Sequence, residues 1–174
     1  MPGVGTEPRL TLVLGGARSG KSRHAEDLVM VLPRPWVYVA TAEPLDDEMT
    51  ARIAAHRTRR AARWQTVEAP RDLCGALIKL PVGAAILVDC LTLWLSNLML
   101  AEDNVEREIE RLEDVLERLR GSAVLVANEV GLGIVPDNVL ARRFRDLAGV
   151  LNQRLAARAD RVVLLVAGLP MMVK

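Results

Sequence analysis

The residues best suited to chemistry form a short glycine-rich segment that ends in a lysine and a serine. Its pattern of glycine, four variable residues, glycine, lysine and serine is typical of loops that bind nucleotide phosphates, and it lies between an apolar run and a helical stretch. Backbone N–H groups, the Lys21 ammonium and the N-terminus of the following helix would all face the phosphates. We therefore expect a nucleoside triphosphate to be bound by Gly15, Gly16, Ala17, Arg18, Ser19, Gly20, Lys21 and Ser22.

Two carboxylates follow apolar runs that are expected to be strands. Asp89 ends the run ILVD, which is where a phosphate-binding loop needs an acid for its metal, so we assign Mg²⁺ to the Ser22 hydroxyl and Asp89. Asp89 is also suited to cap the helix expected after it, and the two roles are compatible. Glu129 follows the run 123–128 at the same edge of the sheet, and the sequence assigns it no role.

The chain contains two histidines, His24 and His56. We expect His24 to be structural. On a helix expected from about residue 46 to 63, His56 shares a stripe with Met49 and Ile53 and so faces the protein. Arginines at 52, 59 and 60 would keep its imidazole neutral and would balance triphosphate charge. These residues alone leave two interpretations open, a nucleophilic histidine or a solvated basic helix.

The phosphate-binding motif is shared by kinases, GTPase switches, ATPase motors and transferases, and it does not choose among them. A guanine signature N-K-x-D is absent where it would be expected, because the sequence there reads Asn128, Glu129, Val130, Gly131. No D-x-x-G switch follows Asp89 either. A regulatory GTPase is therefore disfavoured.

Short apolar runs rich in β-branched residues alternate with helical stretches and would position these groups. The alternation predicts a mostly parallel sheet flanked by helices, with strands at 10–14, 36–40, 85–88, 123–127 and 162–166 and an edge strand near 64–67. The expected fold is the three-layer α/β class of P-loop NTPases of the RecA-like type. We expect one catalytic domain over residues 10–174, preceded by a loose tail at 1–9.

Two amphipathic helices are expected in the second half of the chain. The first begins at Val105 and buries positions 109, 112, 116 and 119, and its stripe is too short for a coiled coil. The second follows Pro136, with Asp137 as its cap and an apolar face of Leu140, Phe144, Leu147, Leu151 and Leu155. Its other face carries Arg142, Arg143, Arg145, Arg154 and Arg158. We expect this face to be solvated, with a phosphate or subunit contact as the alternative.

Composition limits the classes of partner. The net charge is +1, so no overall field favours nucleic acid or an anionic membrane. No stretch predicts a membrane span or a signal peptide, and the spacing of Cys74 and Cys90 predicts buried thiols in a reducing compartment. We expect a cytoplasmic protein.

Several sequence blocks, taken together, indicate a particular protein family. The sequence resembles the bifunctional adenosylcobinamide kinase/adenosylcobinamide-phosphate guanylyltransferase family from Leu10 nearly to Lys174. The blocks are GGARSGKSRHAE (15–26), YVATAEPLDDEMTARIAAHR (38–57), W-x-T-x-E (64–68), LVDCLTLWLSNL (87–98) and NEVGLGIVPDNVLARRFRDLAGVLNQRLA (128–156). The chain has Ala61 where relatives have proline and Asp89 where some have glutamate, and neither change removes a needed group.

The resemblance implies two reactions at one nucleotide site. ATP or GTP phosphorylates the aminopropanol hydroxyl of adenosylcobinamide. His56 then attacks the α-phosphorus of GTP, releases pyrophosphate and passes GMP to adenosylcobinamide phosphate, which gives adenosylcobinamide-GDP. The resemblance also implies a homotrimer and further nucleotide contacts by Thr41, Ala42, Glu43, Arg57, Thr58, Arg59, Arg60, Glu68 and Asp89. Two other readings stay open, a P-loop kinase for another small molecule with His56 inert, and a nucleotide-dependent binding module without chemistry.

Overall fold

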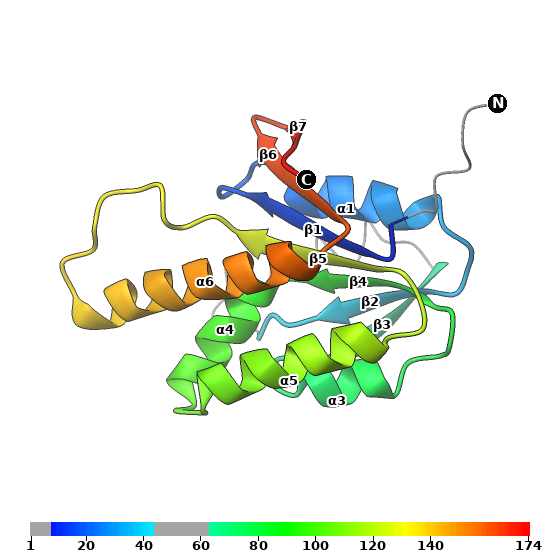
Figure 1. Ribbon diagram of the computed structural model, residues 1–174, viewed down its shortest axis with the longest axis horizontal. Helices are drawn as coiled ribbons and strands as arrows, with labels where there is room; N and C mark the ends of the chain where they lie inside the picture. The colour runs from blue at the N-terminus through cyan, green and yellow to red at the C-terminus, as the bar shows by residue number, and fades with distance from the viewer. Residues whose placement is uncertain (1–7, 44–62) are drawn as a thin grey trace.

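A computed structural model describes residues 8–43 and 63–174, and within them a single sheet runs through the molecule (Figure 1). Its seven strands lie in the order β3-β2-β4-β5-β1-β6-β7. Neighbours are parallel except for β7, which runs antiparallel to β6. The strands are β1 (Leu10–Gly15), β2 (Trp36–Ala40), β3 (Trp64–Glu68), β4 (Ala85–Asp89), β5 (Ala123–Asn128), β6 (Arg161–Val166) and β7 (Leu169–Met172).

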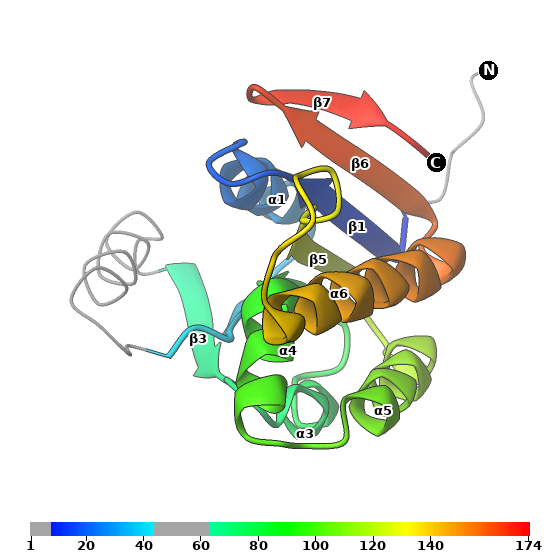
Figure 2. The ribbon, with the colours of Figure 1, turned by 90° about the vertical axis from the view of Figure 1, so that its left-hand side faces the viewer.

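Helices cover both faces of this sheet in the part of the chain that the structure describes. They are α1 (Lys21–Met30), α3 (Leu73–Ile78), α4 (Leu91–Leu100), α5 (Val105–Arg118) and α6 (Val139–Arg158). Alternate residues of each strand point to opposite faces. Leu12 accordingly joins a core with α3, α4, α5 and α6, while Val13 joins a second core with α1 (Figure 2). The three-layer, mostly parallel fold expected from the sequence is confirmed.

The sequence located the strands well and missed two short elements. Every expected strand is present, and the one predicted near residue 64 is β3 at the sheet's edge. Neither α3 nor β7 was expected. The buried thiols are confirmed, because Cys74 and Cys90 are free and buried, and burial raises the pKa of each to about 11.

The start of α6 differs from the prediction. The helix is capped by Asn138, whose side chain accepts a hydrogen bond from the backbone N–H of Ala141 at 2.7 Å, so the cap expected at Asp137 is wrong. Leu140 was expected to be buried and is 56% exposed. Figure 1 shows the reason, because the first turns of α6 extend beyond the sheet edge and no strand lies beneath them.

The arginine face of α6 is only partly solvated. Arg154 makes a bidentate ion pair with Glu113 of α5, and Arg158 approaches the same carboxylate at 3.5 Å. Glu113 is 4% exposed, and the hydrogen bonds from Arg154 lower its pKa. The expectation of a fully solvated face was therefore wrong at Arg154, where the charge joins two helices. Of the described helices, none is both long and apolar enough to cross a bilayer.

Candidate functional site

The glycine-rich loop joins the end of β1 to the start of α1 at the carboxyl edge of the sheet, on the viewer's side in Figure 2. Gly15 is buried with φ +155°, and a Cβ there would lie 2.6 Å from Ser19 Oγ and 2.7 Å from the carbonyl oxygen of Leu165. Gly20 is the N-cap of α1 and has a φ of 94°. This left-handed backbone conformation is one that glycine adopts without strain. Glycine is therefore required at both ends of the loop.

The polar groups of the loop are oriented for an anion. Gly16, Ala17, Arg18 and Gly20 are exposed, while Lys21 is 7% exposed and its Nζ donates to the Gly16 carbonyl at 2.6 Å. Ser19 Oγ is buried and has no hydrogen-bond partner among the described residues. Such an orphaned hydroxyl under a loop and a helix N-terminus is what a bound phosphate would satisfy.

The charge of Asp89 acts on the pKa of Lys21 in this loop. Burial lowers the pKa of Lys21, and the charges of Cys90 and Asp89 oppose that shift. The Asp89 carboxylate accepts a hydrogen bond from the Tyr38 hydroxyl at 3.1 Å. It does not cap α4, whose N-cap is Cys90 without a side-chain cap bond, so the alternative capping role is wrong. The Asp89 carboxylate is therefore close enough to the lysine of the loop to influence its pKa.

Asp89 and Ser22 suit a hard cation bound together with phosphate. A P-loop holds Mg²⁺ through a serine hydroxyl, a carboxylate and phosphate oxygens, with water completing the shell. Ser22 is in the first turn of α1 and is half-buried. No group of three or more His, Cys, Asp or Glu side chains suited to a metal occurs among the described residues, and this type of site does not require one. The donor set therefore fits Mg²⁺ with a nucleotide.

The strand order brings a second carboxylate to the loop. Strand β5 lies between β4 and β1, and its register pairs Asn128 with Gly15. The next residue, Glu129, donates its backbone N–H to the Gly15 carbonyl at 3.0 Å. Glu129 is half-buried, and its Oε1 accepts from the Gly131 N–H at 2.5 Å.

The other expected nucleotide contacts divide into three groups. Thr41 is fully buried, and its hydroxyl accepts from the N–H of Cys90 at 2.8 Å and donates to the Cys90 carbonyl at 2.7 Å. Ala42 and Glu43 follow it and are half-buried, and Glu68 is exposed at the end of β3, where the register places Glu68, Ala40 and Asp89 in one row. The third group, His56, Arg57, Thr58, Arg59 and Arg60, lies outside the described residues.

Thr41 thus holds the turn after Asp89, and a nucleotide contact by Thr41 stays a prediction. Adjacent strands are about 4.8 Å apart, so Glu68 and the end of β1 are separated by roughly 19 Å across four strand spacings. The nucleotide would have to extend along the sheet edge to contact both. The role of Glu68 also stays a prediction.

Sequence reasoning missed several residues that shape the site. Tyr38 was assigned no role from the sequence, and its hydroxyl donates a hydrogen bond to Asp89. The β6–β7 turn supports the loop, because Gly168 donates its N–H to the Ser19 carbonyl at 3.0 Å. Thr92 and Asn152 bind the end of β5 through Asn128. The sequence does not indicate the roles of these residues, because their hydrogen-bond partners are distant in sequence.

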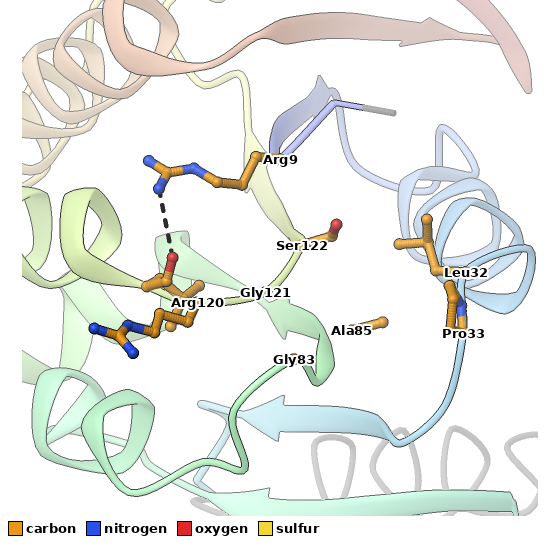
Figure 3. Close-up of a pocket in the computed structure, with 9 residues that line it drawn as sticks. Arg9, Leu32, Pro33, Gly83, Ala85, Arg120, Gly121 and Ser122 are labelled. Carbon is orange, nitrogen blue, oxygen red and sulfur yellow. Dashed lines mark hydrogen bonds between the residues drawn. The ribbon is translucent and has the colours of Figure 1, made fainter. Parts of the chain in front are cut away.

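A cavity of about 550 Å³ lies away from this edge. It is lined by residues that precede strands, including Arg9, Leu32 and Ser122, and so lies at the amino edge (Figure 3). The Arg9 guanidinium donates there to the carbonyls of Glu117 at 3.2 Å and Leu119 at 3.4 Å. Ligands of parallel α/β sheets bind outside the carboxyl ends of strands, so we place the site at the loop.

Comparison with known proteins shows the family of this chain. Residues 11–173 match the family described as cobinamide kinase / cobinamide phosphate guanyltransferase. The chain is 50% identical over 166 residues to the bifunctional adenosylcobalamin biosynthesis protein CobP of Pseudomonas aeruginosa, covering 94% of this chain and 96% of that one. It is 45% identical over 181 residues to the bifunctional adenosylcobalamin biosynthesis protein CobU of Salmonella typhimurium, covering 95% and 99%.

A solved structure extends the comparison to the fold. An ATPase from the type III secretion system of pathogenic bacteria aligns with a TM-score of 0.54 and 12% identity over 91% of this chain and 51% of that one. At this identity the likeness concerns the fold alone. It agrees with the sheet order and helix layers described above.

Proposed function

Since this chain belongs to the cobinamide kinase / cobinamide phosphate guanyltransferase family, we propose that it catalyses both reactions of that description at the loop between β1 and α1. The observation that carries the proposal is a complete phosphate-binding loop whose Lys21 is influenced by the charge of Asp89, in a chain whose family match spans His56. The substrates are ATP or GTP, adenosylcobinamide and adenosylcobinamide phosphate. The product is adenosylcobinamide-GDP.

In the kinase step the loop binds the triphosphate and the acceptor hydroxyl attacks the γ-phosphorus. Backbone N–H groups from Gly15 to Ser22 and the Lys21 ammonium balance the charge that develops on the transferred group and on the β-phosphate. Ser22 and Asp89 would hold Mg²⁺, whose charge would help to neutralise the phosphate oxygens. Tyr38 fixes the orientation of Asp89 through its hydrogen bond.

In the transfer step a nitrogen of the His56 imidazole attacks the α-phosphorus of GTP, and the bond to the bridging oxygen of pyrophosphate breaks. A phosphate oxygen of adenosylcobinamide phosphate then attacks the same phosphorus, the P–N bond breaks, and the imidazole is released neutral. Arg57, Thr58, Arg59 and Arg60 contact the triphosphate, and Glu68 accepts hydrogen bonds from guanine N–H groups. The support for these roles is the family match across residues 11–173.

The setting of the enzyme is part of the proposal. Residues 10–174 form one catalytic domain, the active protein is a cytoplasmic homotrimer, and it needs no nucleic acid. A net charge of +1 supports the last point, because it produces no overall positive field that attracts nucleic acid. Sedimentation of the purified protein measures the assembly directly.

Two labelled nucleotides test the function. With γ-labelled GTP and adenosylcobinamide we expect label on the corrinoid, and with α-labelled GTP alone we expect acid-labile, hydroxylamine-sensitive label on the protein. A kinase for another small molecule would give neither label in these mixtures, and a binding module would retain unmodified GTP. Absence of both labels in a folded protein that binds Mg²⁺GTP would rule the proposal out.

A further inference from the structure

Glu129 has a placement that the proposed function does not use. It is the first residue beyond β5, the strand between the one that ends at Asp89 and the one that leads into the phosphate loop. Its N–H bonds the carbonyl of Gly15, the first residue of the loop. The Glu129 carboxylate therefore lies at the edge where the γ-phosphate end of a nucleotide is bound.

The end of β5 is held firmly. The N–H of Asn128 donates to Thr92 Oγ1 at 2.6 Å, and Asn152 Nδ2 donates to the Asn128 carbonyl at 3.4 Å. The hydrogen bond from the Gly131 N–H then fixes the carboxylate of Glu129 itself. One of its oxygens is occupied by this bond. Packed elements therefore fix the backbone next to Glu129, and a local hydrogen bond orients its carboxylate, which suits it to accept a proton from a positioned substrate.

The segment that follows Glu129 is an exposed apolar surface. Leu132 is 86% exposed and Ile134 97%, and the surface continues through Val135, Val139 and Leu140, which are also exposed. No charged residue occurs from 130 to 136. We call residues 132–140 the acceptor surface. Figures 1 and 2 show this segment projecting from the sheet edge on the side of the phosphate loop.

Contiguous exposed apolar side chains of this kind indicate a binding site. The kinase step requires an alcohol next to the γ-phosphate, and the alcohol belongs to a corrin whose rim carries methyl groups and neutral amide side chains. An apolar surface whose one charged residue is Asp137, directly beyond the loop, suits such a ligand, and the Asp137 carboxylate disfavours a phosphate or a nucleic acid. A second copy of this chain is the other occupant that the surface admits.

On the basis of the proposed function, we propose that the acceptor surface binds the corrin of cobinamide and that Glu129 accepts the proton of its aminopropanol hydroxyl. The hydroxyl oxygen forms a bond to the γ-phosphorus while the bond from that phosphorus to the β–γ bridging oxygen breaks, leaving its electron pair on the nucleoside diphosphate. The hydroxyl proton moves to the Glu129 carboxylate and then to water. Guanylyl transfer to the protein needs no such proton acceptor.

The test uses kinase turnover with γ-labelled GTP and protein labelling with α-labelled GTP. Glu129→Gln keeps the shape and should lower the kcat of the kinase about 100-fold or more with little change in KM for cobinamide. Leu132→Ser and Ile134→Ser should each raise that KM about tenfold. All three should label with α-labelled GTP at the parental level. The matched control is Val82→Ser, a 79% exposed site before β4 at the opposite edge, which should leave KM unchanged.

Several outcomes would overturn the inference. One is a parental kcat in Glu129→Gln, and another is a parental KM in both serine variants. Serine variants that change the sedimentation of the protein but keep the parental KM would assign the surface to a second copy of the chain. A parent enzyme that phosphorylates no cobinamide would instead refute the proposed function, and with it this inference.

Discussion

Replacement of Gly15 by alanine should damage the phosphate loop through a contact that the backbone cannot relieve. The new Cβ would lie 2.7 Å from the Leu165 carbonyl, which belongs to the paired strand β6, and 2.6 Å from Ser19 Oγ. Overpacking of this kind costs about 1–3 kcal/mol. For a domain of this size the melting temperature should fall by roughly 2–12 °C.

The same clash moves Ser19, whose buried hydroxyl we assign to phosphate. Loss of one hydrogen bond to a charged group costs about 1.5–3 kcal/mol, so the Kd for Mg²⁺GTP should rise about tenfold or more. Gly16→Ala is the matched control, because a Cβ there meets no atom within 4 Å. Thermal melts and equilibrium binding measure both effects. A Gly15→Ala protein as stable and as tight-binding as Gly16→Ala would refute the reasoning.

Three further predictions concern the charged groups. Lys21→Ala should impair both phosphorylation and guanylyl transfer, because both begin with the same bound triphosphate, and separate assays would expose an error if either kept its rate. Asp89→Asn should weaken the Mg²⁺ dependence of turnover more than the affinity for metal-free nucleotide, and equal losses in metal titrations would contradict a metal role. Arg154→Leu leaves the buried Glu113 charge poorly paired and should cost about 3 kcal/mol in urea unfolding, more than the double variant with Glu113→Leu. Because the pKa of Glu113 is lowered from 4.5, the advantage of the parent over that double variant should be complete above about pH 4.5 and shrink as the pH falls below it, and an advantage that grows on acidification would disprove the assignment.

The inner strands β1, β2, β4 and β5 could be predicted because each is a short apolar run buried on both faces, as at Leu12 and Val13. The missed elements carry weaker patterns. Strand β7 contains Pro170 and is exposed along its length, so it lacks the buried run that marks the other strands. Helix α3 spans six residues, too few for a helical period to be recognised.

The phosphate loop could be predicted because its residues are contiguous in the sequence. The contacts around it could not, since Tyr38 and Asp89 are 51 residues apart and meet only because β2 pairs with β4. The cap of α6 shows a local limit. Asp137 and Asn138 both favour an N-cap, and the hydrogen bond to Ala141 selects the second.

The exposed position of Leu140 shows a different limit. A helical stripe predicts which residues share a face, but burial depends on what lies opposite. The first turns of α6 extend beyond the sheet, so the stripe there becomes surface. Leu140, which the helical pattern wrongly predicted to be buried, is part of the acceptor surface.

The central claim is that GMP passes through His56. The most direct measurement is the intact mass of the protein after incubation with Mg²⁺GTP, followed by peptide mapping, for the parent, His56→Ala and the matched control His24→Ala. We predict one GMP adduct on the parent and on His24→Ala, mapped to the peptide that contains His56, and none on His56→Ala, which should still phosphorylate cobinamide. An adduct that persists in His56→Ala, or one that maps to His24 or to a lysine, would contradict the claim.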